Sequence, residues 1–433
     1  MDSLTIGDAS ISHRFKSIFG GSVGNLVEWF DWLTFSTFSL YFAHIFFPKG
    51  NQTVQLMDAA AVFAVGHIFR PLGAIYFGWM ADKRGRREAL SLSVLMMCFS
   101  SLMVAIIPGY KVIGLAAPIL LICARILQGL SVGGEYGTSA AYIMEVSAPR
   151  QRGLNVSMLY TTLLVGQLAS ICVLMLLQYV FLTAAQLNEW GWRIPFVIGG
   201  LLGLVALYIR RGIDESPEYL AEQAQGKVRA NPLRLLIHHP REIALVFGLT
   251  MGGALAANTF NVYMPKFLVN TAHFSKEQST LISLLSIIAF MIMQPFVGAL
   301  SDKVGRRPVL IAFGVLGTLL TVPLLNAIAT SHSTNLALLL VIAGLTITSC
   351  YTAINAVVKA ELFSVEMRAV GIGIPYALAT SLFGGTAEYI GLQFKNAGWE
   401  QGYFYYISAG IFISLLVFIF MRETAPKADN TAR

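Results

Sequence analysis

The chain has 433 residues, of which 56% are hydrophobic and 12% are charged, and its net charge at pH 7 is +7. Because soluble domains carry about 25% charged residues, this composition excludes an ordinary soluble protein and indicates one that crosses a membrane repeatedly. Nucleic-acid binding does not explain the net charge, since the basic residues form short clusters between apolar runs rather than one basic face. The four cysteines lie in apolar stretches without paired spacing, so neither a metal site nor a cofactor is expected.

Twelve apolar segments follow one another along the chain, each near the ~20 residues that a membrane-spanning helix needs. They cover residues 18–46, 57–81, 89–107, 117–145, 154–182, 193–211, 242–268, 278–301, 308–329, 335–361, 371–395 and 402–421. A long polar stretch separates the sixth segment from the seventh. The sequence therefore predicts an all-α integral membrane protein with twelve transmembrane helices: a six-helix bundle in residues 1–211, a cytoplasmic linker in 212–241, and a second six-helix bundle with a short tail in 242–433.

Lys and Arg residues are distributed unevenly between the two sides of this predicted bundle. If the N-terminus lies inside, the cytoplasmic segments and helix ends, with Lys359 counted among them, hold 22 of the 30, and the outer segments hold 6. The positive-inside rule therefore places both termini in the cytoplasm. The remaining two, Arg70 and Arg125, lie within predicted helices and belong to neither side.

Two sequence patterns occur once in each half. The decapeptide "GWMADKRGRR" at residues 78–87 recurs as "GALSDKVGRR" at residues 298–307, and each joins the second and third helices of its half. An acidic residue followed seven positions later by an arginine also occurs in both halves, as Glu145 with Arg152 and as Glu361 with Arg368. Six-helix repeats with a binding site at the bilayer midplane are typical of secondary transporters, so these repeats predict two pseudo-symmetric halves.

The loop pattern G-x-x-x-D-x-x-G-R-R resembles the signature of the major facilitator superfamily in both copies. The segments "GNLVEWFDW", "RPLG", "ARILQGLSVGGEYGTSAAYIMEV", "EWGWRIPF" and "FGGTAEY" resemble the metabolite:proton symporter branch of that family. Within the branch, "SLYFAHIFFPKGNQTVQL" and "FLVNTAHF" are similar to segments of bacterial α-ketoglutarate permeases. The resemblance implies a carrier in the bacterial inner membrane that imports a small organic acid, α-ketoglutarate or a related dicarboxylate, with protons by alternating access.

Other functions stay open at this point. Asn258 and Asn261 depart from the permease pattern, so a proton symporter for an osmolyte such as proline or betaine, or for an aromatic or tricarboxylic acid, is an alternative. The two intramembrane arginines favour an acid, since a betaine site would need an aromatic cage. A non-transporting membrane receptor fits less well, because the polar termini are short. We expect a monomer without enzymatic activity, as the chain has no metalloprotease, nucleophile-elbow or nucleotide-loop motif.

Glu28 and Asp31 lie about one helical turn apart in the first apolar segment. A charge at bilayer depth costs ~2.5–3.5 kcal/mol, so these carboxylates and the two intramembrane arginines are expected to face water or each other. Resemblance to proton-coupled sugar porters implies that Asp31 and Arg125 form the proton-coupling pair, with Glu28 as the second candidate. Approach and departure of the arginine would then release and load a proton. A purely structural ion-pair cluster is the alternative.

Arg70, beside Pro71, has no evident local partner in the sequence, and its planar fork matches a carboxylate. We therefore expect it to bind an anion, with pairing to an acid of the first helix as the alternative. Further substrate contacts are expected from Arg125, Gln167, Asn258, Tyr351 and Asn355. Each neutral group among these can instead bond a neighbouring helix. Lys266 and Glu388 are weaker candidates for a charged gate on the outer side.

The repeated loop charges have a separate expected role. In the superfamily such residues hold the two halves together on the cytoplasmic side while the cavity opens outward. The resemblance assigns this gate to Asp82, Arg86, Glu145 and Arg152 in the first half, and to Asp302, Arg306, Glu361 and Arg368 in the second. Topology alone explains the basic residues but not the repeated acids. Glu135 fits either this gate or proton release.

Overall fold

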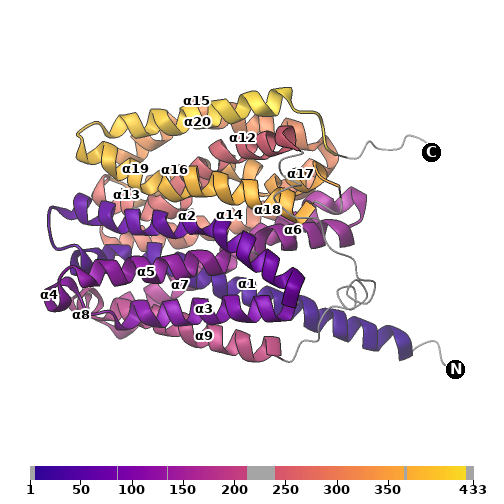
Figure 1. Ribbon diagram of the computed structural model, residues 1–433. Coiled ribbons are helices and arrows are strands. Elements are labelled where there is room, and N and C mark those ends of the chain that lie inside the picture. The colour runs from indigo at the N-terminus through magenta and orange to yellow at the C-terminus, as the bar shows by residue number, and fades with distance from the viewer. Residues whose placement is uncertain (1–4, 85, 134, 212–238, 365–367, 426–433) are drawn as a thin grey trace.

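The computed structural model describes residues 5–84, 86–133, 135–211, 239–364 and 368–425. Its helices form two groups, with the first half of the chain below and the second half above in Figure 1. The described chain begins and finishes at the same end of the molecule, which we call the terminal end, and the opposite end is the far end. Within the described ranges the chain forms helices and turns without a β-strand.

The first half contains the six long helical segments that the sequence predicts. They are α1 (Thr5–Phe46), α2 (Gln52–Arg84), α3 (Arg86–Ile106), α5 (Ala116–Val132) with α6 (Glu135–Val146), α7 (Arg152–Leu176) and α9 (Ile194–Arg211). The short helices α4 (Tyr110–Ile113) and α8 (Ala184–Glu189) lie at the far end. Helix α1 begins before the predicted residue 18, because polar residues outside a bilayer can extend a helix that apolar residues anchor.

The second half also contains six segments, and three of them are interrupted. They are α12 (Pro240–Ala257) with α13 (Met264–Asn270), α14 (Lys276–Val304), α15 (Arg306–Ala329), α16 (Thr334–Thr352) with α17 (Asn355–Glu361), α18 (Arg368–Ala379) with α19 (Gly385–Asn396), and α20 (Glu400–Phe420). The π-helical turns η4 (Asn258–Tyr263) and η5 (Thr380–Gly384) interrupt the first and fifth segments. Such irregular turns occur frequently at functional sites.

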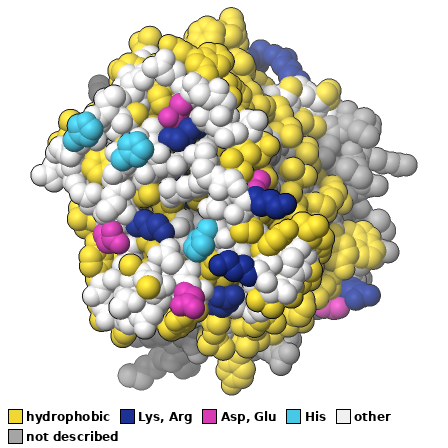
Figure 2. Space-filling view, turned by 90° about the vertical axis from the view of Figure 1, so that its left-hand side faces the viewer, with side chains coloured by type: hydrophobic (Ala, Val, Ile, Leu, Met, Phe, Trp, Pro, Cys, Tyr) yellow, Lys and Arg dark blue, Asp and Glu magenta, His cyan; other side chains and the backbone are white. Residues whose placement is uncertain are grey.

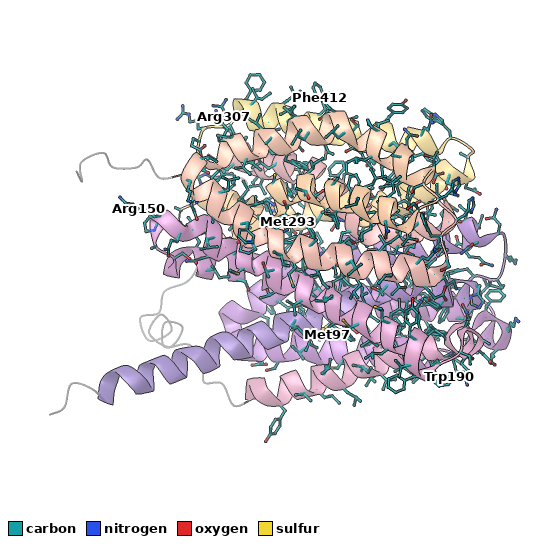
Figure 3. All side chains as sticks on the ribbon, turned by 180° about the vertical axis from the view of Figure 1, so that it is seen from behind. Met97, Arg150, Trp190, Met293, Arg307 and Phe412 are labelled. Atoms are coloured by element: carbon teal, nitrogen blue, oxygen red, sulfur yellow. The ribbon has the colours of Figure 1, made fainter. Side chains whose placement is uncertain are left out.

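Eight described helices are long and apolar enough to cross a membrane: Gln52–Met80, Pro149–Phe181, Pro240–Asn270, Lys276–Val304, Arg306–Ala329, Thr334–Glu361, Val370–Asn396 and Glu400–Phe420. Three more are apolar but shorter: Ser91–Ile106, Ala116–Val132 and Gly191–Val205. Phe412 is half exposed and points away from the bundle (Figure 3). At the far end, hydrophobic side chains form a rim around a face that carries the charged and histidine side chains (Figure 2). Apolar flanks of this extent fit a lipid-facing surface.

The two halves touch along their length. Helix α7 packs along α14, and α2 packs along α19. At the terminal end the backbones come very close, since a methyl group on Gly153 would lie 2.5 Å from the carbonyl oxygen of Gly298. At the far end, Nζ of Lys276 in the second half donates to the carbonyl oxygen of Leu40 at 2.8 Å. The halves are therefore bridged at both ends of the bundle.

Candidate functional site

A close contact between α2 and α5 positions the two intramembrane arginines. A methyl group on Gly129 would lie 2.0 Å from the carbonyl oxygen of Gly66, and one on Gly73 would lie 2.0 Å from that of Leu130. Side chains larger than hydrogen would push the helices apart at both places. Arg70 lies on α2 between the two contacts, and both arginines are buried within the first half.

Asp31 lies at a junction of helices α1, α3, α5 and α9, where 1% of its surface is exposed. The Ser101 hydroxyl donates to Oδ1 of Asp31. The same hydroxyl lies 2.9 Å from the carbonyl oxygen of Phe196. The Gln128 side-chain amide donates to Oδ2 of Asp31 at 2.7 Å. Helix α9 closes the remaining side, since a methyl group on Gly199 would lie 2.7 Å from Oδ1. Neutral donors from two helices thus hold this carboxylate.

Arg125 reaches Asp31 through Gln128 rather than directly. Its Nη1 donates to the Gln128 side-chain oxygen, and its guanidinium lies 4.2 Å from the Trp32 ring centre and 4.5 Å from that of Phe35. Its Nε and Nη2 have no hydrogen-bond partner in the described chain. The expected pair of Asp31 and Arg125 is therefore an acid–amide–arginine relay instead of a direct ion pair.

Arg70 lines a small cavity with Glu28, Trp29, Val132, Tyr136, Ser139, Leu159 and Leu163. Its guanidinium lies 5.3 Å from the ring centres of both Trp29 and Trp32. It is only 5% exposed, yet among the described residues it donates no hydrogen bond and forms no ion pair. Glu28 and two tyrosines, Tyr136 and Tyr376, lie close enough to interact with it electrostatically. A buried arginine facing a cavity in this way is suited to receive an anion.

A polar cluster that includes Tyr136 of the Arg70 cavity joins the halves. Tyr136 of the first half stacks on Tyr376 of the second, with ring centres 4.0 Å apart, and its hydroxyl donates to the Asn355 side-chain oxygen at 2.6 Å. Lys359 donates to the same oxygen at 3.1 Å and to the Tyr351 hydroxyl at 3.3 Å. Lys359 was counted among the basic residues of cytoplasmic segments and helix ends, and its side chain is fully buried.

Gln167 and Asn261 form a reciprocal amide pair across the two halves. The Gln167 amide donates to Asn261 at 3.0 Å, and the Asn261 amide donates back at 2.7 Å. Both residues line a second cavity, whose walls come from α1 and α7 on one side and from α14 and the turn η4 on the other. Asn258 does not join this pair, since its amide donates to the carbonyl oxygen of Ala254 in its own helix.

Lys266 and Glu388 form a buried ion pair in the second half, with Nζ and Oε2 2.5 Å apart. The same ammonium donates to the Ser36 hydroxyl of the first half at 2.6 Å. The Lys266–Glu388 ion pair of the second half is thus hydrogen-bonded to Ser36 of the first half.

The gate residues of the second half form a cluster at the terminal end. The Asp302 carboxylate accepts from the backbone N–H groups of Gly153 and Leu154 at 2.8 and 2.9 Å, at the start of α7 in the opposite half. Arg306 pairs with Asp302 at 2.8 Å and with Glu361 at 3.5 Å. A carboxylate at a helix N-terminus is favoured by both hydrogen bonding and the helix dipole.

The remaining gate residues are placed less completely. Arg152 interacts electrostatically with Glu361, and Arg368 donates to the carbonyl oxygen of Ala360 at 3.0 Å. The side chains of Asp82, Arg86, Glu135 and Glu145 lie outside the described residues. Basic residues of both halves, Arg150 and Arg307, lie at this end, and Trp190 lies at the other (Figure 3).

Several site residues were not singled out from the sequence, among them Ser101, Gln128 and Lys359. Neutral polar side chains are common in membrane helices, so Ser101 and Gln128 carried no signal of their own. Gln128 lies three residues after Arg125 and therefore on the same helix face, which is the one clue that was available. For Lys359 the clue was its position inside the predicted tenth helix, 335–361.

A family model described as the Major Facilitator Superfamily matches residues 23–374 and 246–433. The chain is 46% identical over 410 residues to the alpha-ketoglutarate permease of Escherichia coli strain K12, covering 95% of this chain and 94% of that one. It is 31% identical to the glycine betaine/proline/ectoine/pipecolic acid transporter OusA of Dickeya dadantii, covering 99% and 86%. It is also 31% identical to the citrate-proton symporter of Klebsiella pneumoniae, covering 97% and 94%.

Among solved structures, the D-xylose-proton symporter superposes with a TM-score of 0.76 at 21% identity, covering 95% of this chain and 99% of that one. The xylose transporter XylE from E. coli in a partially occluded inward-open conformation superposes with a TM-score of 0.75 at 21% identity, covering 96% and 100%. At this identity the likeness concerns the fold, which agrees with the two six-helix groups described above. The chain belongs to the Major Facilitator Superfamily.

Proposed function

We propose that this protein is a proton-coupled symporter that imports α-ketoglutarate or a related dicarboxylate by alternating access. One observation carries the choice of an acid: Arg70 is buried, faces a cavity and donates no hydrogen bond to any described residue. Its interactions with Glu28 and with the Trp29 and Trp32 rings compensate this buried charge in part, and a carboxylate accepting two parallel hydrogen bonds would compensate it further. The 46% identity to an alpha-ketoglutarate permease supports this choice of acid.

Asp31 is the proposed proton site. As a carboxylate it accepts from Gln128, whose own side-chain oxygen accepts from Arg125. We place the proton on Oδ2, which faces Gln128. This oxygen then becomes a donor, and Gln128 turns its own oxygen toward it, because a side-chain amide has one acceptor atom. Arg125 thereby loses its hydrogen-bond acceptor. Protonation of Asp31 would in this way be transmitted to the aromatic residues around Arg125, among them Trp32, which also contacts Arg70.

Alternating access requires that the two ends of the bundle open in turn. The Asp302 contacts close the terminal end and the Lys276 contacts close the far end. We propose that the terminal end is cytoplasmic, because the predicted basic segments of both halves lie there. We further propose that the protein works as a monomer in the bacterial inner membrane, with residues 1–211 and 242–433 as the two moving units.

An osmolyte carrier is the alternative, and OusA is a relative of that kind. Betaine and proline carry a positive group beside their carboxylate, and that group would enter a cavity that holds the Arg70 guanidinium together with the Glu28 carboxylate. The Arg70 guanidinium matches any carboxylate, whether it belongs to a dicarboxylate or to a tricarboxylate. Lys359, a second buried cation, bears on the choice between these acids.

Uptake of labelled α-ketoglutarate into proteoliposomes with an imposed pH gradient tests the proposal. We expect accumulation above equilibrium when the outside is acidic, loss of accumulation with a protonophore, and competition by dicarboxylates but not by betaine or proline. Proteoliposomes that hold the Arg70→Ala variant are the matched control for leakage. Equal uptake with and without the gradient, or competition by betaine instead, would contradict the proposal.

A further inference from the structure

Lys359 is a buried cation that neither the proton relay nor the gate uses. It lies on α17, just after the break between Thr352 and Asn355 in the tenth spanning segment, and none of its surface is exposed. Asn355 fixes this break by donating to the carbonyl oxygen of Thr352 at 2.7 Å. The break therefore holds the ammonium within the protein rather than at a helix end in water.

The partners of Lys359 are all neutral in the described chain. Its ammonium donates to the Asn355 side-chain oxygen and the Tyr351 hydroxyl, and it lies 4.1 Å from the ring centre of Tyr376. No described carboxylate pairs with it, in contrast to Lys266, whose ammonium lies 2.5 Å from Glu388. Neutral oxygens and a ring face compensate a buried charge only in part, whereas hydrogen bonds between ions are roughly twice as strong.

Lys359 and Arg70 approach the same pair of tyrosines from different halves. Arg70 lines its cavity with Tyr136 and interacts electrostatically with Tyr376, while Lys359 lies over the Tyr376 ring and shares the Asn355 oxygen with Tyr136. The stacked tyrosines thus separate one buried cation of the first half from one of the second. A dicarboxylate carries two negative groups on a short chain. This matches two cations placed on either side of the Tyr136–Tyr376 stack.

We propose that Lys359 receives the distal carboxylate of the substrate while Arg70 holds the other, so that the protein selects dicarboxylates over monocarboxylates. This rests on the proposed function and adds the residue that sets the class of acid. The Tyr136–Tyr376 stack opens as the substrate bridges the cations, and the carboxylate replaces the Asn355 and Tyr351 oxygens around the ammonium. Because the two cations come from opposite halves, binding of both carboxylates also draws the halves together.

Paired ligands in a fluorescence titration of the purified full-length protein test this inference. α-Ketoglutarate and 2-oxopentanoate differ only in the distal carboxylate, and Trp29 and Trp32 beside Arg70 report binding of either one. We expect the wild type to prefer α-ketoglutarate by ~10-fold or more, which is the effect of one charge-assisted contact. Lys359→Gln should remove this preference by weakening α-ketoglutarate binding alone, and Lys359→Arg should keep part of it.

Two further variants make the test independent of folding effects. The double variant Lys266→Gln/Glu388→Gln removes a whole buried ion pair of the same half without leaving either charge unpaired, and it should keep the preference of the wild type. Asn355→Asp places a carboxylate beside Lys359 without removing the lysine, and it should lose the preference as Lys359→Gln does. A wild type that binds no α-ketoglutarate would refute the proposed function and this inference with it. A wild type that prefers α-ketoglutarate, with the same preference in Lys359→Gln or in Asn355→Asp, would refute this inference alone.

Discussion

The two halves of the molecule repeat each other in their loops but differ in the charges they bury. The first half holds Asp31, Arg70 and Arg125 within helices α1, α2 and α5, and the neutral side chain of Gln128 links Asp31 to Arg125. The second half holds Lys266 and Lys359, and its helices are interrupted at two π-helical turns and one break. The first half therefore offers a relay for a proton, and the second offers irregular backbone around two buried lysines, of which only Lys266 is paired with a described carboxylate, Glu388.

This difference indicates a division of roles between the halves. A proton site needs a carboxylate whose surroundings change with conformation, and the Asp31 relay is built from side chains that can rearrange while their helices stay in place. A moving gate needs helices that can bend, and interrupted helices bend more readily than continuous ones. The substrate is shared, because Arg70 and the Lys359 cluster face each other across the tyrosine stack.

The largest expected effect comes from removing the proton site. Asp31→Asn should abolish accumulation of α-ketoglutarate against its gradient while leaving counterflow exchange measurable, because the amide keeps the shape but cannot take up a proton. Proteoliposome uptake with and without a pH gradient measures both activities. Glu28→Gln is the control, and it should still accumulate substrate. If only Glu28→Gln lost accumulation, the coupling carboxylate would be Glu28.

The next largest effect concerns Arg70, the buried cation of the first half that is proposed to hold the substrate. Arg70→Lys should weaken α-ketoglutarate binding by ~10- to 100-fold, because the ammonium keeps the charge but not the bidentate fork. The tryptophan titration measures this affinity. Arg193→Lys, an exchange at a partly exposed arginine of the far end, is the control for a general effect of lost guanidinium. An Arg70→Lys variant with wild-type affinity would exclude Arg70 from the binding site.

A smaller effect is expected at the two ends of the bundle. Asp302→Asn removes the charge that holds the start of α7 and should shift the population about fivefold toward the form open at the terminal end, on the order of 1 kcal/mol. A Ser157→Cys reporter between α7 and α14, in a background without other cysteines, should react correspondingly faster with a maleimide. Lys276→Gln loosens the far end and should slow the same reaction. Equal rates in all three backgrounds would mean that neither contact controls opening.

The smallest effect is expected at the amide pair between the halves. Gln167→Ala and Asn261→Ala each remove neutral hydrogen bonds worth about 0.5–1.5 kcal/mol, so each should change transport by only a few-fold. The double variant should be no worse than either single variant if the two amides act as one pair. An additive loss in the double variant would show that the residues act separately, for instance through independent substrate contacts.

The sequence predicts the fold in detail because twelve apolar segments and a repeated loop leave little freedom. Asp31, Arg70 and Arg125 can also be recognised in the sequence, because a charge inside an apolar segment is costly unless it faces water or another charge. The spacing of Gln128 from Arg125 and the position of Lys359 inside the tenth predicted helix were clues, but the partners of both residues depend on which helices meet. The π-helical turns Asn258–Tyr263 and Thr380–Gly384 have no recognised sequence signal and had to be observed.

The most direct test of the division of roles is proton uptake on substrate binding, in weakly buffered solution with a pH indicator. By linkage, a substrate that favours protonation of the coupling site must draw protons onto the protein when it binds. We expect the wild type to take up protons when α-ketoglutarate is added, and Asp31→Asn to bind α-ketoglutarate without taking up any. Proton uptake by Asp31→Asn equal to that of the wild type would contradict the account, because coupling would then lie elsewhere in the molecule.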